Sequence, residues 1–198
     1  MNSLRLWHLK NSKVKPLIEI ETKIKLETED TINLLKELIP IEIVQPRLFE
    51  DNYCFDYPDK ILSKKGFLFR LRISEPKNIL TLKGPSRKKV GFKIRQELEL
   101  TLDNPINMLV ILKKIGFKII FRYQKYRTIY NSNGLKICFD ETPIGLFLEL
   151  EGEKNQIIEL VNKIGLNKKV FIPFSYYYLF RMYKRKYNIK DKHMIFNK

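Results

Sequence analysis

The sequence of 198 residues is poor in the residue types that build disulfide-stapled or metal-clustered folds. It has two cysteines, Cys54 and Cys138, and two histidines, His8 and His193, which lie near the two ends of the chain. A disulfide scaffold and a cysteine-rich zinc site are therefore excluded, and a histidine-based metal site is not expected. Eight glycines and nine prolines are also too few for a collagen-like or disordered chain.

Long apolar runs and the common nucleotide-binding motifs are missing as well. No stretch approaches the ~18 apolar residues that a membrane span needs. The basic first 16 residues lack the continuous apolar segment of a secretory signal. There is no P-loop, no G-x-G-x-x-G string and no Ser/His/Asp arrangement, which argues against kinases, dehydrogenases and triad hydrolases. We therefore expect a soluble, cytoplasmic protein.

Acidic residues are outnumbered, 22 against 38 lysines and arginines, which gives a net charge of +16. Much of this excess lies at the two ends of the chain. We predict a basic N-terminal arm over 1–16, one domain over 17–180, and a basic C-terminal tail or helix extension over 181–198. Such a balance is typical of proteins with an anionic partner such as phosphate, nucleic acid or an acidic membrane surface.

The C-terminal stretch 181–198 holds seven basic residues and one acid, with Tyr183 and Tyr187 between them. Cations interleaved with aromatic rings can follow a phosphate backbone, so a weak nucleic-acid contact through the basic termini is one interpretation. A solvated helix end is the other, and we favour it.

Most of the region between the ends alternates polar and apolar residues at the period of a β-strand. In 17-LIEIETKIKL-26, for example, one face is charged and the other is apolar. This alternation predicts eight strands, over 17–26, 43–57, 67–73, 79–84, 92–102, 117–130, 135–141 and 146–152. In the sixth of them, Arg122 falls out of step with Lys125 and Arg127, which predicts a bulge or bend.

Four helices are predicted between and after these strands, over about 31–39, 105–116, 153–164 and 174–187. The second begins at Asp103-Asn104-Pro105, with proline in its first turn, and Gly116 ends it. The order of strand, helix and three strands occurs twice. We therefore expect a single domain of two similar halves, roughly 17–91 and 92–165.

Three of the predicted strands carry the pattern Glu-x-Glu. The pairs are Glu19/Glu21, Glu97/Glu99 and Glu149/Glu151. Side chains at such spacing stand about 7 Å apart on one face, and two carboxylates there repel by about 2 kcal/mol at an effective dielectric of ~20. Several such pairs in one fold need cations. Cationic side chains alternate on the same kind of face: Lys23, Arg70, Arg72, Lys83, Arg95, Lys125 and Arg127.

Eight strands can close into a barrel that is just wide enough for side chains or one small ligand. If the charged faces point inward, the barrel holds an acidic cluster beside a basic one, and helices cover its apolar outside. Carboxylates suit Mg²⁺ or Mn²⁺, while arginine and lysine suit phosphate. Together they predict a phosphoryl-transfer site. The alternative for each strand is a charged face turned to solvent.

The string Glu19-x-Glu21-x-Lys23 resembles the signature of the CYTH superfamily, the triphosphate tunnel metalloenzymes that include thiamine triphosphatases, inorganic triphosphatases and class IV adenylyl cyclases. Further segments follow in the order that this family shows, over about residues 17–180. They are Phe55-Asp56-Tyr57-Pro58-Asp59, Leu68-x-Arg70-x-Arg72, Thr81-Leu82-Lys83-Gly84-Pro85, Arg95-x-Glu97-x-Glu99, Lys125-x-Arg127, Asp140-Glu141, Gly145-Leu146-Phe147-Leu148-Glu149-Leu150-Glu151 and Ser175-Tyr176.

The resemblance implies an α+β fold in which a closed eight-stranded antiparallel β-barrel forms a tunnel, with helices packed outside. It implies that carboxylates bind one or two divalent ions, Mg²⁺ or Mn²⁺, and that cations bind a triphosphate. The metal ligands would be Glu19, Glu21, Asp140, Glu149 and Glu151, with Glu97 and Glu99 next in line. The phosphate contacts would be Lys23, Arg70, Arg72, Lys83, Arg95, Lys125 and Arg127. One lysine, Lys23 or Lys83, could protonate the leaving phosphate.

These features favour a metal-dependent phosphohydrolase acting on inorganic triphosphate or on an organic or nucleoside triphosphate, because attack by water needs the fewest added features. A class IV adenylyl cyclase, which makes cyclic AMP and pyrophosphate from ATP, also needs an adenine pocket, and no residue in the sequence marks one. A non-catalytic binder of polyphosphate or RNA is the third hypothesis. Carboxylates in its groove would serve such a binder poorly.

Overall fold

The computed structural model describes residues 17–89 and 91–197, so the expected N-terminal arm over 1–16 lies outside the described residues. The strands are β1 (Leu17–Leu26), β2 (Glu42–Asp56), β3 (Leu68–Ile73), β4 (Asn78–Lys83), β5 (Arg87–Lys89), β6 (Phe92–Leu102), β7 (Lys118–Ser132), β8 (Leu135–Thr142) and β9 (Gly145–Glu151). The helices are α1 (Asp30–Leu38), α2 (Ile61–Lys64), α3 (Pro105–Lys114), α4 (Lys154–Lys163), the 3-10 turn η2 (Lys168–Val170) and α5 (Tyr176–Tyr187).

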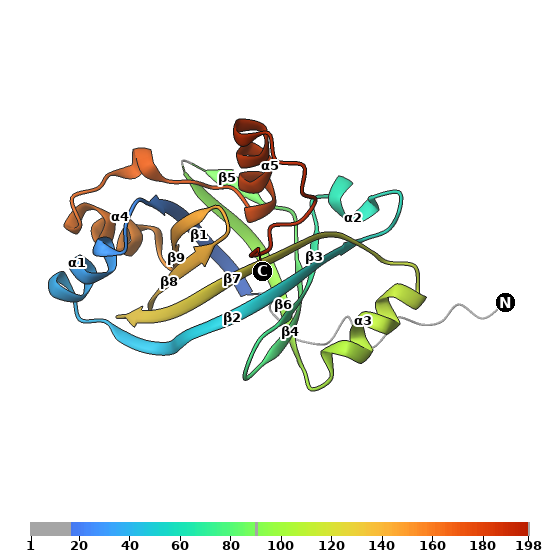
Figure 1. The fold of residues 1–198 in the computed structure, drawn as a ribbon. Coiled ribbons are helices and arrows are strands. Elements are labelled where there is room, and N and C mark those ends of the chain that lie inside the picture. The colour runs from blue at the N-terminus through green and yellow to red at the C-terminus, as the bar shows by residue number, and fades with distance from the viewer. Residues whose placement is uncertain (1–16, 90, 198) are drawn as a thin grey trace.

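Eight of these strands form a closed antiparallel ring (Figure 1). Their order is β1-β9-β8-β7-β2-β3-β4-β6, and β6 pairs back with β1 to complete the circle, while the short β5 pairs with β6 beside the ring. The register of the closing pair sets Ile20 opposite Ile94. This confirms the expected α+β fold, a closed eight-stranded tunnel with helices packed outside.

The outer face of the ring is covered by helices because its side chains are apolar. Helices α1 and α4 pack on one side, where Leu35 and Ile157 are fully buried against Ile137 and Leu148. Helix α3 packs on another side through Leu112. These contacts follow from the alternation of each strand, since the residues that do not face inward must be removed from water by another element.

One end of the barrel interior is filled by aromatic side chains. Phe121 of β7 and Phe147 of β9 cluster with Tyr176 and Phe180 of α5 and with Met194 from the C-terminal segment. All five are nearly or fully buried. This apolar cluster, to which α5 contributes two residues, therefore bounds the charged part of the interior at this end.

The eight predicted strands and four predicted helices are confirmed to within two residues at most ends, whereas α2, β5 and η2 were not predicted. A bulge lies close to Arg122, but not between Arg122 and Lys125, where the mismatch predicted one. The pairing of β2 with β7 runs without a shift from Arg122 to Arg127, so Arg122 follows the regular alternation and faces away from Lys125 and Arg127. The pairing of β2 with β7 shifts between Cys54, opposite Phe121, and Phe55, opposite Ile119. Two more shifts lie at the start of β2, over residues 43–48.

The second half of α5 is largely exposed, in line with the solvated helix end that we favoured, but the segment after it packs back onto the barrel. Helix α5 ends at Tyr187, and the left-handed backbone of the next residue, Asn188, turns the chain. Met194 then donates its N–H to the carbonyl of Arg122 at 3.0 Å and accepts from the N–H of Gln124 at 2.8 Å. This edge is available because β8 pairs only with residues 126–132 of β7.

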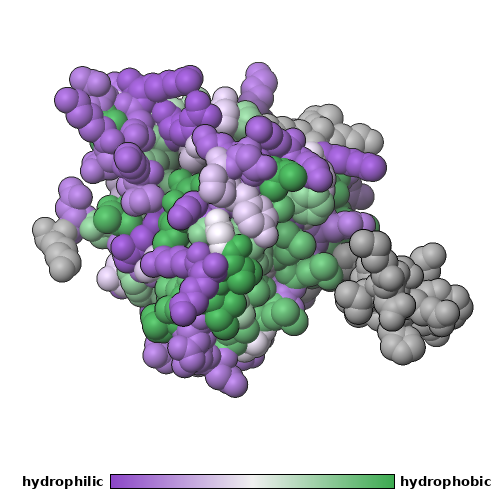
Figure 2. All heavy atoms as spheres, turned by 90° about the vertical axis from the view of Figure 1, so that its right-hand side faces the viewer, coloured by the Kyte–Doolittle hydropathy of each residue, from purple (hydrophilic) through white to green (hydrophobic). Residues whose placement is uncertain are grey.

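Helix α3 leaves apolar side chains on the surface. Ile106, Val110, Ile111 and Ile115 are 46–60% exposed, and Figure 2 shows hydrophobic residues gathered among charged ones on the face that carries this helix. Within the described part of the chain, no helix has the length and apolarity to cross a membrane.

Candidate active site

The three Glu-x-Glu pairs lie on neighbouring strands, because β1 pairs with both β6 and β9. Glu21 stands directly opposite Glu151, and Leu17 stands opposite Glu97. We call the inner face of β1, β6 and β9 the acidic wall. Most of the cations project from β3, β4, β7 and β8 into the same interior. We call the inner face of these four strands the basic wall.

The two walls enclose a cavity of about 500 Å³. Its lining includes seven carboxylates, Glu19, Glu21, Glu97, Glu99, Glu149, Glu151 and Glu153. It also includes eight cations, Lys23, Arg70, Arg72, Lys83, Lys93, Lys125, Arg127 and Lys136. The charged faces therefore point into a shared interior, and the alternative of faces turned to solvent is wrong for these strands.

Three of the carboxylates are close enough to share one ion. Oxygens of Glu19, Glu21 and Glu151 all lie within 4.8 Å of one another. Burial and the neighbouring charge of Glu21 raise the pKa of Glu19 to about 7. A carboxyl that resists ionisation beside other carboxylates indicates a surplus of negative charge, and hard oxygen donors are the ligands that Mg²⁺ and Mn²⁺ prefer. These residues fit a divalent cation.

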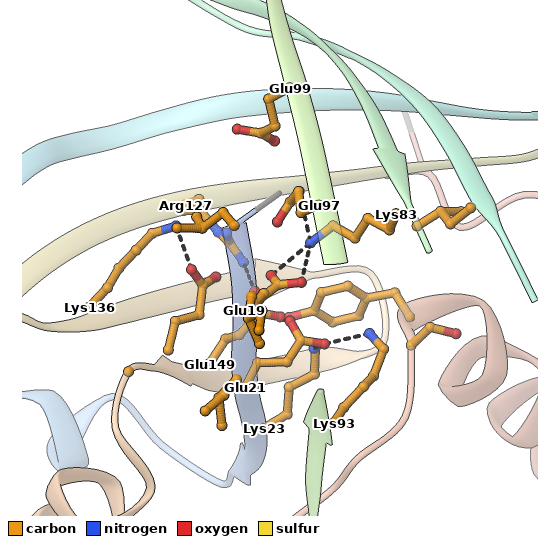
Figure 3. Close-up of a pocket in the computed structure, with 18 of the residues that line it drawn as sticks. Glu19, Glu21, Lys23, Lys83, Lys93, Glu97, Glu99, Arg127, Lys136 and Glu149 are labelled. Carbon is orange, nitrogen blue, oxygen red and sulfur yellow. Dashed lines mark hydrogen bonds and ion pairs between the residues drawn. The ribbon is translucent and has the colours of Figure 1, made fainter. Parts of the chain in front are cut away.

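Lysines surround this cluster (Figure 3). The Nζ of Lys83 lies 2.7 Å from both carboxylate oxygens of Glu19 and 3.0 Å from Glu97. Lys93 contacts Glu21. Lys93 was not among the predicted site residues, although the alternation of 92–102 places it on the same face as Glu97. Every lysine here is paired with a carboxylate, so the cluster is partly neutralised from within.

Lys23 links the acidic and basic walls. Its Nζ lies 2.6 Å from Glu149 and 3.3 Å from Glu21. Arg127 on β7 approaches Glu149 from the other side at 2.8 Å. Burial disfavours the charge of Lys23, but Glu149 and Glu21 outweigh it and raise the pKa of this lysine above its ordinary value.

Asp140 holds the basic wall together. It accepts two bonds from Arg127, at 2.6 and 2.7 Å, one from Lys125 at 2.9 Å and one from the hydroxyl of Tyr176 at 2.5 Å. The side chain is fully buried and does not line the cavity. Asp140 was expected as a metal ligand, and the structure occupies both of its oxygens with protein donors; the metal role stays a prediction.

Arg70 and Arg72 extend the basic wall along β3. Arg70 donates to the Tyr123 hydroxyl at 3.1 Å and to Thr81 at 3.2 Å, and Arg72 donates to Glu50 at 3.0 Å. The Nε of each arginine is buried without an acceptor among the described residues. This wall therefore keeps unused donor capacity.

Two arginines, Arg95 and Arg122, lie away from the cavity. Arg95 turns toward the end of β4, where its Nε and Nη2 donate to the carbonyl of Gly84 at 2.9 and 2.6 Å. It does not line the cavity, so its phosphate contact stays a prediction. Arg122 points outward and donates two bonds to Asp51, at 2.9 and 2.6 Å.

Sequence reasoning did not assign Glu50, Tyr123, Tyr176 or Lys136 to the site. Lys136 lies 2.7 Å from Glu151, and its alternation with Asp140 on one strand is a signal that could have found it. Tyr176 appeared only through the resemblance. Glu50 had no signal, because the register shifts in the first half of β2 break the alternation from which its direction could be read.

A family model described as "CYTH domain" matches residues 17–169. The chain is similar to a protein of Methanocaldococcus jannaschii named "Putative adenylate cyclase MJ0240", with 28% identity over 171 residues, 81% of this chain and 97% of that protein.

Two solved structures show the same fold. One is described as a "putative adenylate cyclase" from Vibrio parahaemolyticus, with a TM-score of 0.75, 19% identity, and coverage of 84% of this chain and 99% of that one. The other is a "Putative adenylyl cyclase HpAC1" from Hippeastrum that "reveals a dominant triphophatase activity", with a TM-score of 0.62, 20% identity, and coverage of 83% and 95%.

Proposed function

This chain belongs to the CYTH domain family, and from that premise we propose that it is a divalent-metal-dependent triphosphatase that hydrolyses inorganic triphosphate or an organic or nucleoside triphosphate. The observation that carries the proposal is that carboxylates line one side of the cavity and cations line the other. Glu19, Glu21 and Glu151 gather on the acidic wall, while the cations of β3 and β7 face the same space. A polyphosphate with bound metal ions is complementary to both walls.

The carboxylates of Glu19, Glu21 and Glu151 would hold Mg²⁺ or Mn²⁺, with the other lining carboxylates Glu97, Glu99 and Glu149 nearby. The ion would neutralise charge on the phosphate oxygens and act as a Lewis acid. Asp140 was also predicted as a metal ligand; an ion there would have to displace at least one of its present donors, Lys125, Arg127 and Tyr176.

The cations of the two walls would bind and orient the phosphate groups. Arg70, Arg72 and Arg127 supply planar forks that suit paired phosphate oxygens. Lys23 and Lys83 have pKa values raised above the ordinary lysine value: burial opposes their charge, but it is outweighed by Glu149 for Lys23 and by Glu19 for Lys83. Both therefore hold a proton at neutral pH, and we propose that one of them donates it to the leaving phosphate.

Class IV adenylyl cyclase is the second candidate, since the relatives from Methanocaldococcus and Vibrio are named "putative adenylate cyclase". A cyclase needs a surface for adenine. Among the described residues that line the cavity, the aromatic ones are Tyr123 and Tyr176, and both hydroxyls are engaged, with Arg70 and with Asp140. Hydrolysis needs no adenine surface, because water is the nucleophile, and we therefore propose it ahead of cyclisation.

Purified protein should be assayed with tripolyphosphate, thiamine triphosphate and ATP, each with Mg²⁺, with Mn²⁺ and with a chelator. The proposal expects metal-dependent release of inorganic phosphate. Cyclic AMP and pyrophosphate from ATP would establish the cyclase instead. A chain that turns over none of the three substrates while it binds tripolyphosphate would be a non-catalytic binder.

A contact with RNA through α5 is a separate proposal. Its solvent face carries Tyr177, Arg181 and Arg185, and no acidic residue lies in the helix. Truncation at 181 would remove the buried Met194, so the double substitution Arg181→Gln and Arg185→Gln is the better test. RNA affinity measured across salt concentrations should lose about two units of slope; an unchanged slope would remove the idea.

A further inference from the structure

Glu50 is a buried carboxylate that the proposed chemistry does not use. It lies on the inner face of β2, opposite Lys125 in the register with β7, and its side chain is 2% exposed. Its described partners are Arg72 at 3.0 Å and Lys125 at 3.5 Å. Burial disfavours its charge, but Lys125 and Arg72 outweigh that effect and hold the pKa of Glu50 well below the ordinary value. Glu50 is therefore ionised between two cations.

The position of Glu50 relative to the cavity is informative. Arg72 and Lys125 line the cavity, whereas Glu50 does not, so the carboxylate lies behind them. Lys125 has a second anchor in Asp140, at 2.9 Å. The second carboxylate near Arg72 is Glu99, which is 3.6 Å away and 40% exposed on the acidic side. Without Glu50, Glu99 would be the one remaining ion-pair partner of Arg72 among the described residues, and it would draw the guanidinium toward the acidic wall.

We propose that Glu50 is a positioning residue that fixes the direction of Arg72, and secondarily of Lys125, toward the bound polyphosphate. The inference rests on the proposed function, because it assumes that these two cations contact the substrate. The carboxylate acts through its hydrogen bond to the Arg72 guanidinium and touches no reacting atom.

If Glu50 acted only through its negative charge, replacing it would have the opposite effect on substrate binding. If Glu50 only lowered the positive potential of the basic wall, replacing it with glutamine would strengthen the binding of a polyanion. If Glu50 positions Arg72, the same replacement weakens binding, because the guanidinium loses a buried charge-assisted hydrogen bond and turns toward Glu99. The sign of the change in affinity separates the two accounts.

The experiment measures the affinity of the metal-free full chain for tripolyphosphate by calorimetry, in the presence of a chelator, for wild type and Glu50→Gln. We expect about a tenfold loss of affinity. With metal ions added, KM for tripolyphosphate should rise by a similar factor while kcat changes less, a split that a general loss of stability would not produce. Unchanged or tighter binding by Glu50→Gln would overturn the proposal.

Two further variants complete the test. Asp51→Asn removes a carboxylate from the next residue of β2, which faces outward and binds Arg122, so its affinity should equal that of wild type. Glu50→Asp keeps the charge and shortens the side chain; it should also weaken binding, and this variant decides if Glu50→Gln does not fold. Wild-type affinity in Glu50→Asp would contradict positioning.

The role of Glu50 and the triphosphatase activity can be tested separately. If wild type binds and hydrolyses tripolyphosphate but Glu50→Gln matches it, only the role of Glu50 is wrong. If wild type neither binds nor hydrolyses any triphosphate, the proposed function is wrong, and the role of Glu50 falls with it.

Discussion

The acidic and basic walls of the cavity differ in how their charges are balanced. On the acidic wall the carboxylates crowd one another, and the pKa of Glu19 is raised to about 7 by burial and by Glu21. On the basic wall Lys125 and Arg127 share the buried counter-charge of Asp140, and Arg72 has Glu50. The acidic wall therefore keeps a surplus of negative charge that an added cation would neutralise. The cations of the basic wall are held in position before any ligand binds.

This difference indicates how one cavity can bind an ion and a polyanion together. Preorganised donors lose little freedom when the substrate binds, which favours the chemical step. The acidic wall gains most when the ion enters, because the repulsion among its carboxylates is relieved.

The largest effect is expected when the basic wall loses its central anchor. Asp140→Asn leaves Lys125 and Arg127 buried without their main counter-charge, and breaking such a network costs about 3–5 kcal/mol. Chemical denaturation should show this loss in the free energy of unfolding. If Asp140 instead served chiefly as a metal ligand, the variant would be nearly as stable as wild type without metal and would fail to respond to Mn²⁺.

The second effect concerns the acidic wall. Saturating Mn²⁺, at about 100 times its Kd, should stabilise wild type by about 2.7 kcal/mol. Glu151→Gln removes one of the three clustered carboxylates and frees the half-exposed Lys136, so it should reduce this stabilisation without greatly altering the metal-free protein. Thermal unfolding with and without Mn²⁺ measures both. An undiminished Mn²⁺ effect in Glu151→Gln would place the ion elsewhere.

The third effect is the pH dependence of the same stabilisation. Because the pKa of Glu19 is about 7, its carboxyl keeps a proton below that pH, and the ion must displace it. Metal affinity should therefore be larger at pH 8 and fall by about tenfold for each pH unit below 7, or about 1.4 kcal/mol. Glu19→Gln should bind metal weakly with no such dependence. A flat profile for wild type would contradict the protonation of Glu19.

The smallest effect is expected outside the barrel. Arg47 forms a two-pronged pair with Glu141, at 2.7 and 2.9 Å, but its side chain is 53% exposed. Exposed pairs contribute about 0–1 kcal/mol. Glu141→Gln, one residue from Asp140, should therefore change the unfolding free energy by no more than that and leave the Mn²⁺ response intact. A loss of unfolding free energy near that of Asp140→Asn would contradict the expected difference between buried and exposed ion pairs.

The alternation of the strands predicted much of the fold and most of the cavity lining. A period of two assigns each residue to a face, and a barrel has only two faces, so Glu19, Arg70 and Arg127 could be placed inside without coordinates. The helices were predicted for a similar reason, as with Pro105 and Gly116 at the ends of α3.

What the sequence could not predict depends on neighbours and on irregularities. No local pattern says that β1 pairs with both β6 and β9, which is what brings Glu151 next to Glu21. The register shifts in β2 hid the direction of Glu50. The return of Met194 to β7 depends on β8 being shorter than its partner, which is a property of the whole sheet.

A crystal structure of the full chain with Mn²⁺ and tripolyphosphate tests the central claim most directly. We predict anomalous density for manganese among Glu19, Glu21 and Glu151, with phosphate oxygens against Arg70, Arg72 and Arg127. Manganese bound outside the barrel, or a tripolyphosphate held on the exterior with the cavity filled only by water, would contradict it.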